Sequence, residues 1–174
     1  MNKRPIATRA YQDAIANIGV TEQGGENRGK YVETYLAAAG ARKGDPWCMA
    51  FVYFRFKSAA DTLQIPLPKL FPRTASTVVA SNWYKDSGRW ITHQQARANP
   101  DLVQPGDMVF FYFAAKRRIA HVGIVIAIQA DGVWTVEGNT SDGTGVDRDG
   151  DGVYKRFRTW KSLGAGGGFG RSDF

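Results

Sequence analysis

The hydrophobic periodicity of the sequence changes near its midpoint, and this change constrains the fold more than any other feature. In the first half, apolar residues recur at helical spacing, for example over residues 31–39, where Gly40 supplies the stop signal. In the second half, short apolar or alternating segments are separated by turn residues, a pattern typical of strands. Helices followed by antiparallel strands predict an α+β fold, with the helices packed on one side of a sheet.

The predicted elements follow from this division. Helices are expected over residues 7–18, 31–39, 46–60 and 76–84. Strands are expected over residues 108–113, 121–128, 133–139 and 153–160, with a final short strand around Phe169. At 174 residues the chain is long enough to bury a core, and no internal repeat is visible. We therefore expect a single domain over residues 1–174.

Charge and cysteine content narrow the classes of function. The chain has 23 Lys and Arg against 16 Asp and Glu, a formal net charge of +7. This excess favours a polyanionic partner, such as nucleic acid, an anionic membrane surface or an acidic cell-wall polymer, although it could also serve solubility alone. The single cysteine excludes an internal disulfide and a multi-thiolate zinc site.

That cysteine stands in "DPWCMAFVYF", directly after a predicted helix start. Asp45 is a favoured N-cap residue and Pro46 suits the first helical position, so Cys48 is expected in the first turn. The free backbone N–H groups and the dipole of a helix N-terminus favour a thiolate and could also stabilise an oxyanion. The alternative is a small buried residue at a helix start. Position alone leaves both interpretations open.

His121 opens the predicted strand "HVGIVIAI", and the next strand contains "TVEGN". Strand alternation places Glu137 and Asn139 on one face. If the loop between the strands covers residues 128–132, His121 lies opposite Asn139, and Glu137 lies diagonally from it across Gly123. Either Glu137 or Asn139 could then accept a hydrogen bond from the imidazole, as the third member of a triad does. A register slip of one residue would separate them.

These motifs together resemble the CHAP family, the cysteine- and histidine-dependent amidohydrolases and peptidases of papain-like fold. The similar segments are "GDPWCMAFV", "PGDMVFF", "HVGIV" and "VEGNTS", and the resemblance covers about residues 20–160. It implies that Cys48 is the nucleophile, His121 the base and Glu137 the third triad member, with Asn139 as an accompanying amide. It also implies that no metal or other cofactor is required for the chemistry.

The resemblance implies hydrolysis of an amide bond in bacterial peptidoglycan, by an endopeptidase or an N-acetylmuramoyl-L-alanine amidase. The N-terminal residues lack the apolar run of a secretory signal. We therefore expect synthesis in the cytoplasm and action in the periplasm or on the wall after phage- or secretion-mediated export, as for a phage lysin or an antibacterial effector. Peptidoglycan is the expected partner of a monomer, and a holin, secretion machinery or an immunity protein would be further partners.

Two alternatives belong to other functional classes. A non-catalytic wall-binding module could keep the same fold without turnover. A nucleic-acid-binding protein could use the basic charge, but no motif for reading nucleic acid is present, so we expect neither nucleic-acid binding nor membrane insertion. The basic clusters at residues 116–118 and 155–158 fit an anionic wall polymer equally well. His93 stands in a polar stretch and is interpreted as a surface residue.

The segment "DRDGDG" raises the question of a calcium site. Asp147, Asp149 and Asp151 have the spacing of the first three ligands of a calcium loop, and Gly152 occupies the sixth position. The twelfth position, however, is Arg158 rather than a glutamate, and no second helix follows. A solvated turn is therefore the favoured interpretation, with Ca²⁺ binding at the three aspartates as the alternative.

Overall fold

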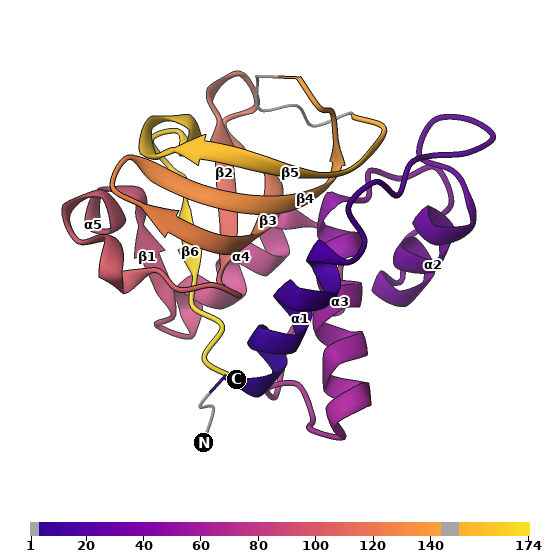
Figure 1. Ribbon diagram of the computed structural model, residues 1–174, viewed down its shortest axis with the longest axis horizontal. Helices are drawn as coiled ribbons and strands as arrows, with labels where there is room; N and C mark the ends of the chain where they lie inside the picture. Colours follow the sequence, from indigo (N-terminus) through magenta and orange to yellow (C-terminus); the bar gives the residue numbers. More distant parts are fainter. Residues whose placement is uncertain (1–3, 144–149) are drawn as a thin grey trace.

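The fold is built on one six-stranded antiparallel sheet (Figure 1). A computed structural model describes residues 4–143 and 150–174, so Asp147 and Asp149 of the predicted calcium loop lie outside the described residues. The strand order is β1-β6-β2-β3-β4-β5. The strands are β1 (Trp90–Thr92), β2 (Met108–Phe113), β3 (Arg118–Gln129), β4 (Gly132–Thr140), β5 (Gly152–Thr159) and β6 (Gly168–Gly170).

Four helices form the layer on one face of this sheet: α1 (Pro5–Ile15), α2 (Lys30–Ala39), α3 (Cys48–Leu63) and α4 (Thr77–Asp86). Helices α1, α3 and α4 contact the sheet, and α2 packs against α3 (Figure 1). Ten of the sixteen residues of α3 are buried, which makes it the central helix. The predicted α+β architecture, with helices on one side of an antiparallel sheet, is confirmed. No helix in the described part of the chain has the length and apolar character needed to cross a membrane.

Elements that the sequence did not predict cover part of the opposite face. Helix α5 (His93–Ala98) and the 3₁₀ turn η3 (Trp160–Leu163) contribute Ala96 and Leu163 to a second buried cluster. Helix α5 begins with a capping box, in which the side chains of Thr92 and Gln95 each accept a hydrogen bond from the backbone N–H of the other. This Thr-x-x-Gln pattern was the signal that could have revealed the helix.

Helix α3 begins two residues later than predicted. Asp45 does not cap it, because its carboxylate accepts a hydrogen bond from the backbone N–H of Arg42 at 2.9 Å and so closes a local turn. Trp47 is the N-cap residue and provides no side-chain cap. The predictions of Asp45 as N-cap and Pro46 as first helical residue were therefore wrong. Cys48 nevertheless lies in the first turn, as its first helical residue.

The hairpin between β3 and β4 is tighter than predicted. Gln129 pairs with Gly132, which leaves a two-residue loop, so the prediction of a loop over residues 128–132 was wrong. A β-bulge farther along the hairpin shifts the register by one residue, and beyond it Ile124 pairs with Val136. Beyond the bulge, the residues of β3 and β4 therefore pair in the same register that a loop over residues 128–132 would have produced.

Candidate active site

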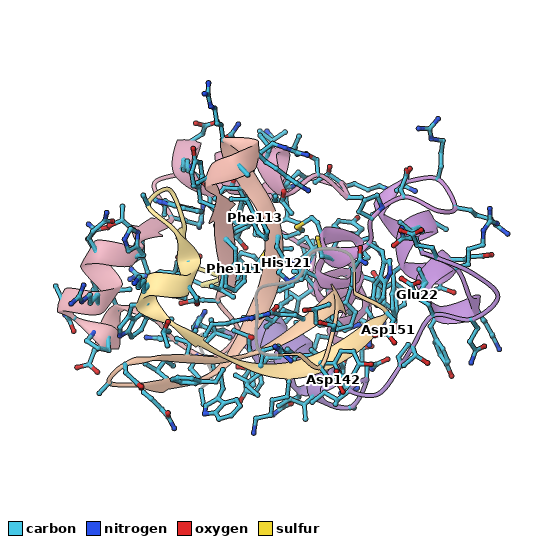
Figure 2. All side chains as sticks on the ribbon, turned by 90° about the horizontal axis from the view of Figure 1, so that it is seen from above. Glu22, Phe111, Phe113, His121, Asp142 and Asp151 are labelled. Atoms are coloured by element: carbon cyan, nitrogen blue, oxygen red, sulfur yellow. The ribbon has the colours of Figure 1, made fainter. Side chains whose placement is uncertain are left out.

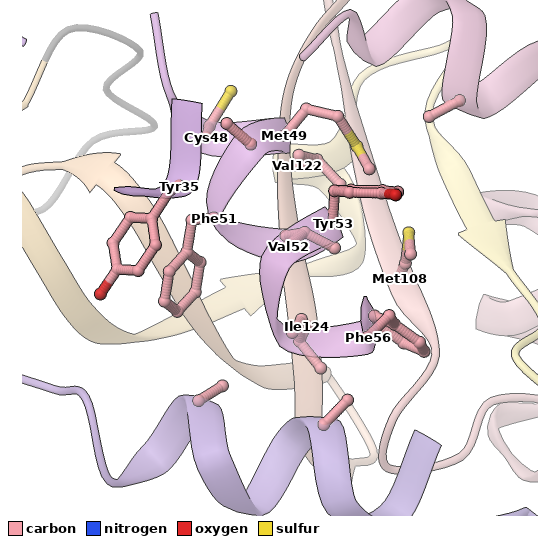
Figure 3. Close-up of a cluster of buried hydrophobic side chains, with 14 of the residues drawn as sticks. Tyr35, Cys48, Met49, Phe51, Val52, Tyr53, Phe56, Met108, Val122 and Ile124 are labelled. Carbon is pink, nitrogen blue, oxygen red and sulfur yellow. The ribbon is translucent and has the colours of Figure 1, made fainter. Parts of the chain in front are cut away.

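Cys48 lies at the edge of the helix layer and lines a cavity of about 260 Å³. Its side chain is largely buried, at 3% exposure. Figure 3 shows the sulfur at the first turn of α3, directed away from the buried side chains of Phe51 and Phe56 farther along the helix. The other residues that line this cavity are Asp45, Pro46, Ala75, Ser76, Thr77, Arg118 and Ala120. Cavities elsewhere on the molecule are larger, but Cys48 lines none of them.

His121 lies on β3 with its imidazole fully buried and paired to a carboxylate. Its Nε2 is 2.8 Å from Oε2 of Glu137, and both side chains have no exposed surface. Its Nδ1 is buried without a hydrogen-bond partner in the described part of the structure. Because Glu137 occupies Nε2, Nδ1 is the ring nitrogen left for proton exchange with the nearby Cys48 thiol, which raises the pKa of the imidazole. Phe111 packs beside the ring, at a centroid distance of 5.5 Å (Figure 2).

A β-bulge immediately before His121 sets the direction of its side chain. Phe111 pairs with His121, but the next residue of β2, Tyr112, pairs with Ile119, so Ala120 is the extra residue of β3. A bulge of this kind re-aims the side chains next to it and occurs often at active sites. Ala120 lines the Cys48 cavity, and the bulge therefore brings β3 to the edge of the cleft.

Glu137 is held on both carboxylate oxygens. Arg158 donates from Nε to Oε1 at 2.7 Å and from Nη2 to Oε2 at 2.6 Å, and Thr135 donates its hydroxyl to Oε1 at 2.6 Å. A two-pronged arginine–carboxylate contact fixes both position and plane of the carboxylate. Gly123 leaves the necessary space, since a Cβ there would lie 2.6 Å from Cγ of Glu137. Gly123 thus lies next to Glu137 and leaves space for it, as predicted.

The two partners shift each other's pKa values in opposite directions. Burial alone would lower the pKa of His121, but the nearby Cys48 thiol and the hydrogen bond and negative charge of Glu137 outweigh it and raise the pKa to about 9. Burial alone would raise the pKa of Glu137, but hydrogen bonds and positive charge from Arg158 and His121 lower it to about 2. At neutral pH the pair is therefore an imidazolium and a carboxylate.

Asn139 takes a different position from the one expected. A bulge between β4 and β5 and the left-handed backbone of Asn139, with φ of 56°, break the strand alternation after Glu137. Asn139 therefore turns toward α3, where its Oδ1 accepts the backbone N–H of Trp47 at 2.8 Å and its Nδ2 donates to the carbonyl of Gly150 at 2.9 Å. Of the two candidates for orienting the imidazole, Glu137 is the one that makes the hydrogen bond.

Gly138 stands between these two residues and allows β4 to approach α3 closely. A Cβ at this position would lie 2.7 Å from the Trp47 ring and 2.8 Å from Cβ of Phe51. A side chain of any size would push the helix away from the strand. The segment 137–139 therefore contacts both the imidazole and the helix start.

Arg158 contacts the candidate site through Glu137, and the sequence interpretation missed it. It was assigned to an exposed basic cluster over residues 155–158, but its side chain is only 2% exposed. Strand alternation was the available signal, because Arg158, Arg156 and Tyr154 share one face of β5, and Tyr154 pairs directly with Glu137. Of that cluster, Lys155 is exposed, while Arg156 and Arg158 are buried.

The described residues contain no group of three or more His, Cys, Asp or Glu side chains that could hold a metal ion. Asp151, the one aspartate of the predicted calcium loop that the structure describes, accepts a hydrogen bond from the Tyr154 hydroxyl at 3.1 Å. Figure 2 shows Asp151 and Asp142 on the side of the molecule that carries Glu22.

Stability is expected to depend on pH through His121. Because the folded-state pKa is raised from 6.5 to about 9, its stabilising contribution is complete below pH 6.5 and is lost as pH rises through 9. A shift of this size corresponds to about 3 kcal/mol. Denaturant unfolding between pH 6 and 10 measures the loss. His121→Gln should remove this pH dependence, whereas His93→Gln, which changes the other histidine, should keep it. Identical profiles for both variants would contradict the assignment.

One family model and one solved structure are similar to this chain. The CHAP domain family model matches residues 40–139, more than half of the chain, and the match includes Cys48, His121, Glu137 and Asn139. Among solved structures, the crystal structure of Ly7917 is similar at 17% sequence identity with a TM-score of 0.48, over 96% of this chain and 62% of that chain. The chain thus spans about three fifths of the length of Ly7917. No curated protein sequence matches it.

Proposed function

Because the chain belongs to the CHAP family, we propose that it hydrolyses an amide bond of bacterial peptidoglycan by cysteine nucleophilic catalysis. The bond lies either within the stem peptide and its cross-bridge or between the stem and the glycan, so the enzyme is an endopeptidase or an N-acetylmuramoyl-L-alanine amidase. The observation that carries the proposal is the arrangement of Cys48, His121 and Glu137: a largely buried thiol that lines a cavity, near an imidazole whose far nitrogen is fixed by a buried carboxylate.

The first chemical step uses the start of α3. The Cys48 thiolate attacks the amide carbonyl, and the imidazolium of His121 balances its charge from Nδ1. Trp47 gives no side-chain cap, so the first backbone N–H groups of α3, including that of Cys48, are available to the developing oxyanion. Asn139 keeps the preceding N–H, that of Trp47, occupied.

In the steps that follow, the imidazole of His121 acts first as a general acid and then as a general base. His121 gives its Nδ1 proton to the leaving amine, which departs and leaves an acyl-enzyme on Cys48. The neutral imidazole then accepts a proton from water as the water attacks the thioester, and Cys48 is released. Glu137 holds Nε2 throughout and stabilises the imidazolium when it re-forms, as the acidic member of a triad does.

Digestion of purified sacculi followed by mass spectrometry of the soluble products tests this function. An amidase releases intact stem peptides and leaves glycan with free lactyl groups, whereas an endopeptidase produces new amine and carboxyl ends within the peptide. We expect one of these two product sets and a rise in free amine groups. Sedimentation of the protein with sacculi without new ends would instead favour a wall-binding module.

The biological setting that we propose is that of a phage lysin or a secreted antibacterial effector, which reaches the wall from outside or across the membrane. The net charge of +7 supports contact with an anionic wall. Loss of turbidity of bacteria whose wall is accessible, on addition of the protein, is the expected readout.

A further inference from the structure

The Cys48 cavity has one cationic wall. Arg118, the first residue of β3, lines it and is exposed, three positions before His121. No hydrogen bond, ion pair or ring contact engages the Arg118 side chain among the residues that the structure describes, in contrast to Arg158 on the same sheet. A free guanidinium beside a nucleophile is a binding group for a planar anion, because its N–H groups form a fork that matches a carboxylate.

The cationic character continues beyond Arg118. A second cavity of about 230 Å³ shares Arg118 with the first and is also lined by Lys85 of α4 and Arg117. Both cavities lie between α4 and the start of β3, the first at the beginning of α4 and the second along the helix as far as Lys85. These elements are joined where the Thr77 hydroxyl donates to the carbonyl of Ile119 at 2.9 Å. A buried hydrogen bond therefore holds α4 and β3 together where they line the two cavities.

One carboxylate, that of Asp45, lines the first cavity, and it does not neutralise Arg118. Its Oδ2 accepts the backbone N–H of Arg42 at 2.9 Å and lies 4.0 Å from the Arg42 guanidinium. The charged groups that line the two cavities are thus three cations and one carboxylate engaged with Arg42.

We propose that Arg118 is a substrate-binding residue that receives a free carboxylate of the stem peptide, close to the scissile amide, with Arg117 and Lys85 extending the anionic subsite. This inference rests on the proposed function and names the substrate feature that the cleft selects: a stem whose carboxyl groups are free rather than amidated. The neighbouring position of Arg118 and Cys48 in one cavity places that carboxylate within one or two residues of the bond that is cut.

The experiment compares two forms of the same sacculi, stripped of phosphate-containing accessory polymers: one native, and one whose free carboxyl groups have been converted to amides with a carbodiimide and ammonia. For the wild-type protein we expect kcat/KM to be about 10- to 100-fold higher on the native form, the range for a hydrogen bond to a charged group. Arg118→Gln should bring the native rate down to that of the amidated form, and Arg118→Lys should restore part of it. Arg97→Gln, an exposed arginine on α5, should keep the full discrimination.

A binding measurement separates failure of this inference from failure of the proposed function. Cys48→Ala protein, with and without Arg118→Gln, is sedimented with both forms of the sacculi in 0.05 M and 0.5 M salt. Stronger binding to the native form, lost with Arg118→Gln and weakened by salt, supports the subsite even if no bond is cut. Equal binding to both forms, or discrimination that survives Arg118→Gln, overturns it. A parallel sedimentation uses sacculi that retain their phosphate polymers, and a preference seen only with those sacculi also overturns it.

Discussion

Cys48→Ala and Cys48→Ser are expected to lower the release of new ends from sacculi by on the order of 1,000-fold or more, as loss of a nucleophile does. Both variants remove or replace one atom at a helix start, where the backbone N–H groups and the His121–Glu137 pair remain. The free energy of unfolding should therefore change by only about 1 kcal/mol. Activity and denaturant unfolding are measured on the same preparations.

Two controls make the result specific to the thiol. Met49→Leu alters the adjacent buried residue of α3 and should keep most of the activity, because it conserves volume and leaves the cleft unchanged. Iodoacetamide should inactivate the wild-type protein with one alkyl group per chain, since Cys48 is the only cysteine. Wild-type rates in either Cys48 variant would contradict the proposed mechanism.

Arg158→Met is expected to have the largest effect on stability. The substitution keeps an unbranched buried side chain but leaves the Glu137 carboxylate without the guanidinium that contacts both of its oxygens. Removing one partner of a buried ion pair costs about 3–5 kcal/mol. The pKa of Glu137 should rise from its lowered value of about 2, so the acid limb of the pH–activity profile should move to higher pH. Denaturant unfolding and a pH–rate profile measure the two effects.

A double variant distinguishes the structural contribution of Arg158 from its effect on the site. In Glu137→Gln/Arg158→Met, the uncompensated carboxylate is gone, and His121 can become neutral because the carboxylate that raised its pKa is also gone, so stability should recover relative to Arg158→Met alone. Activity should stay low, because glutamine carries no charge to stabilise the imidazolium. Arg97→Met, at an exposed position, should change neither quantity. An Arg158→Met protein as stable as the wild type would show that the ion pair contributes little.

The sequence predicted the layers of the fold because each layer has its own periodicity. The central helix follows from a single apolar segment, and the sheet from alternating segments with turn residues between them. Cys48 could be assigned to a first helical turn even though Asp45 is not the cap, since the helix starts within two residues of the predicted position. Helix boundaries depend on which local hydrogen bonds a polar residue forms, and the sequence did not reveal that Asp45 bonds to Arg42.

The parts of the site that could not be predicted depend on β-bulges. Simple alternation placed Asn139 beside Glu137, but one extra residue and a left-handed backbone turned it toward Trp47. A bulge inserts one residue without a strong composition signal, and every side chain beyond it changes face. Arg158 was missed for a different reason. The sequence does not distinguish a buried arginine from an exposed one unless the carboxylate that it pairs with on the neighbouring strand is known.

The segment 137–139 has a consequence for how this scaffold can be modified. Glu137 fixes the imidazole, Gly138 allows the helix to approach, and Asn139 anchors the backbone just ahead of Cys48, all within three consecutive residues. The spacing between thiol and imidazole is therefore set by three consecutive residues of β4 rather than by the loops that surround the cleft. Loops grafted from other members of the family could therefore reshape the cleft while this spacing is inherited unchanged.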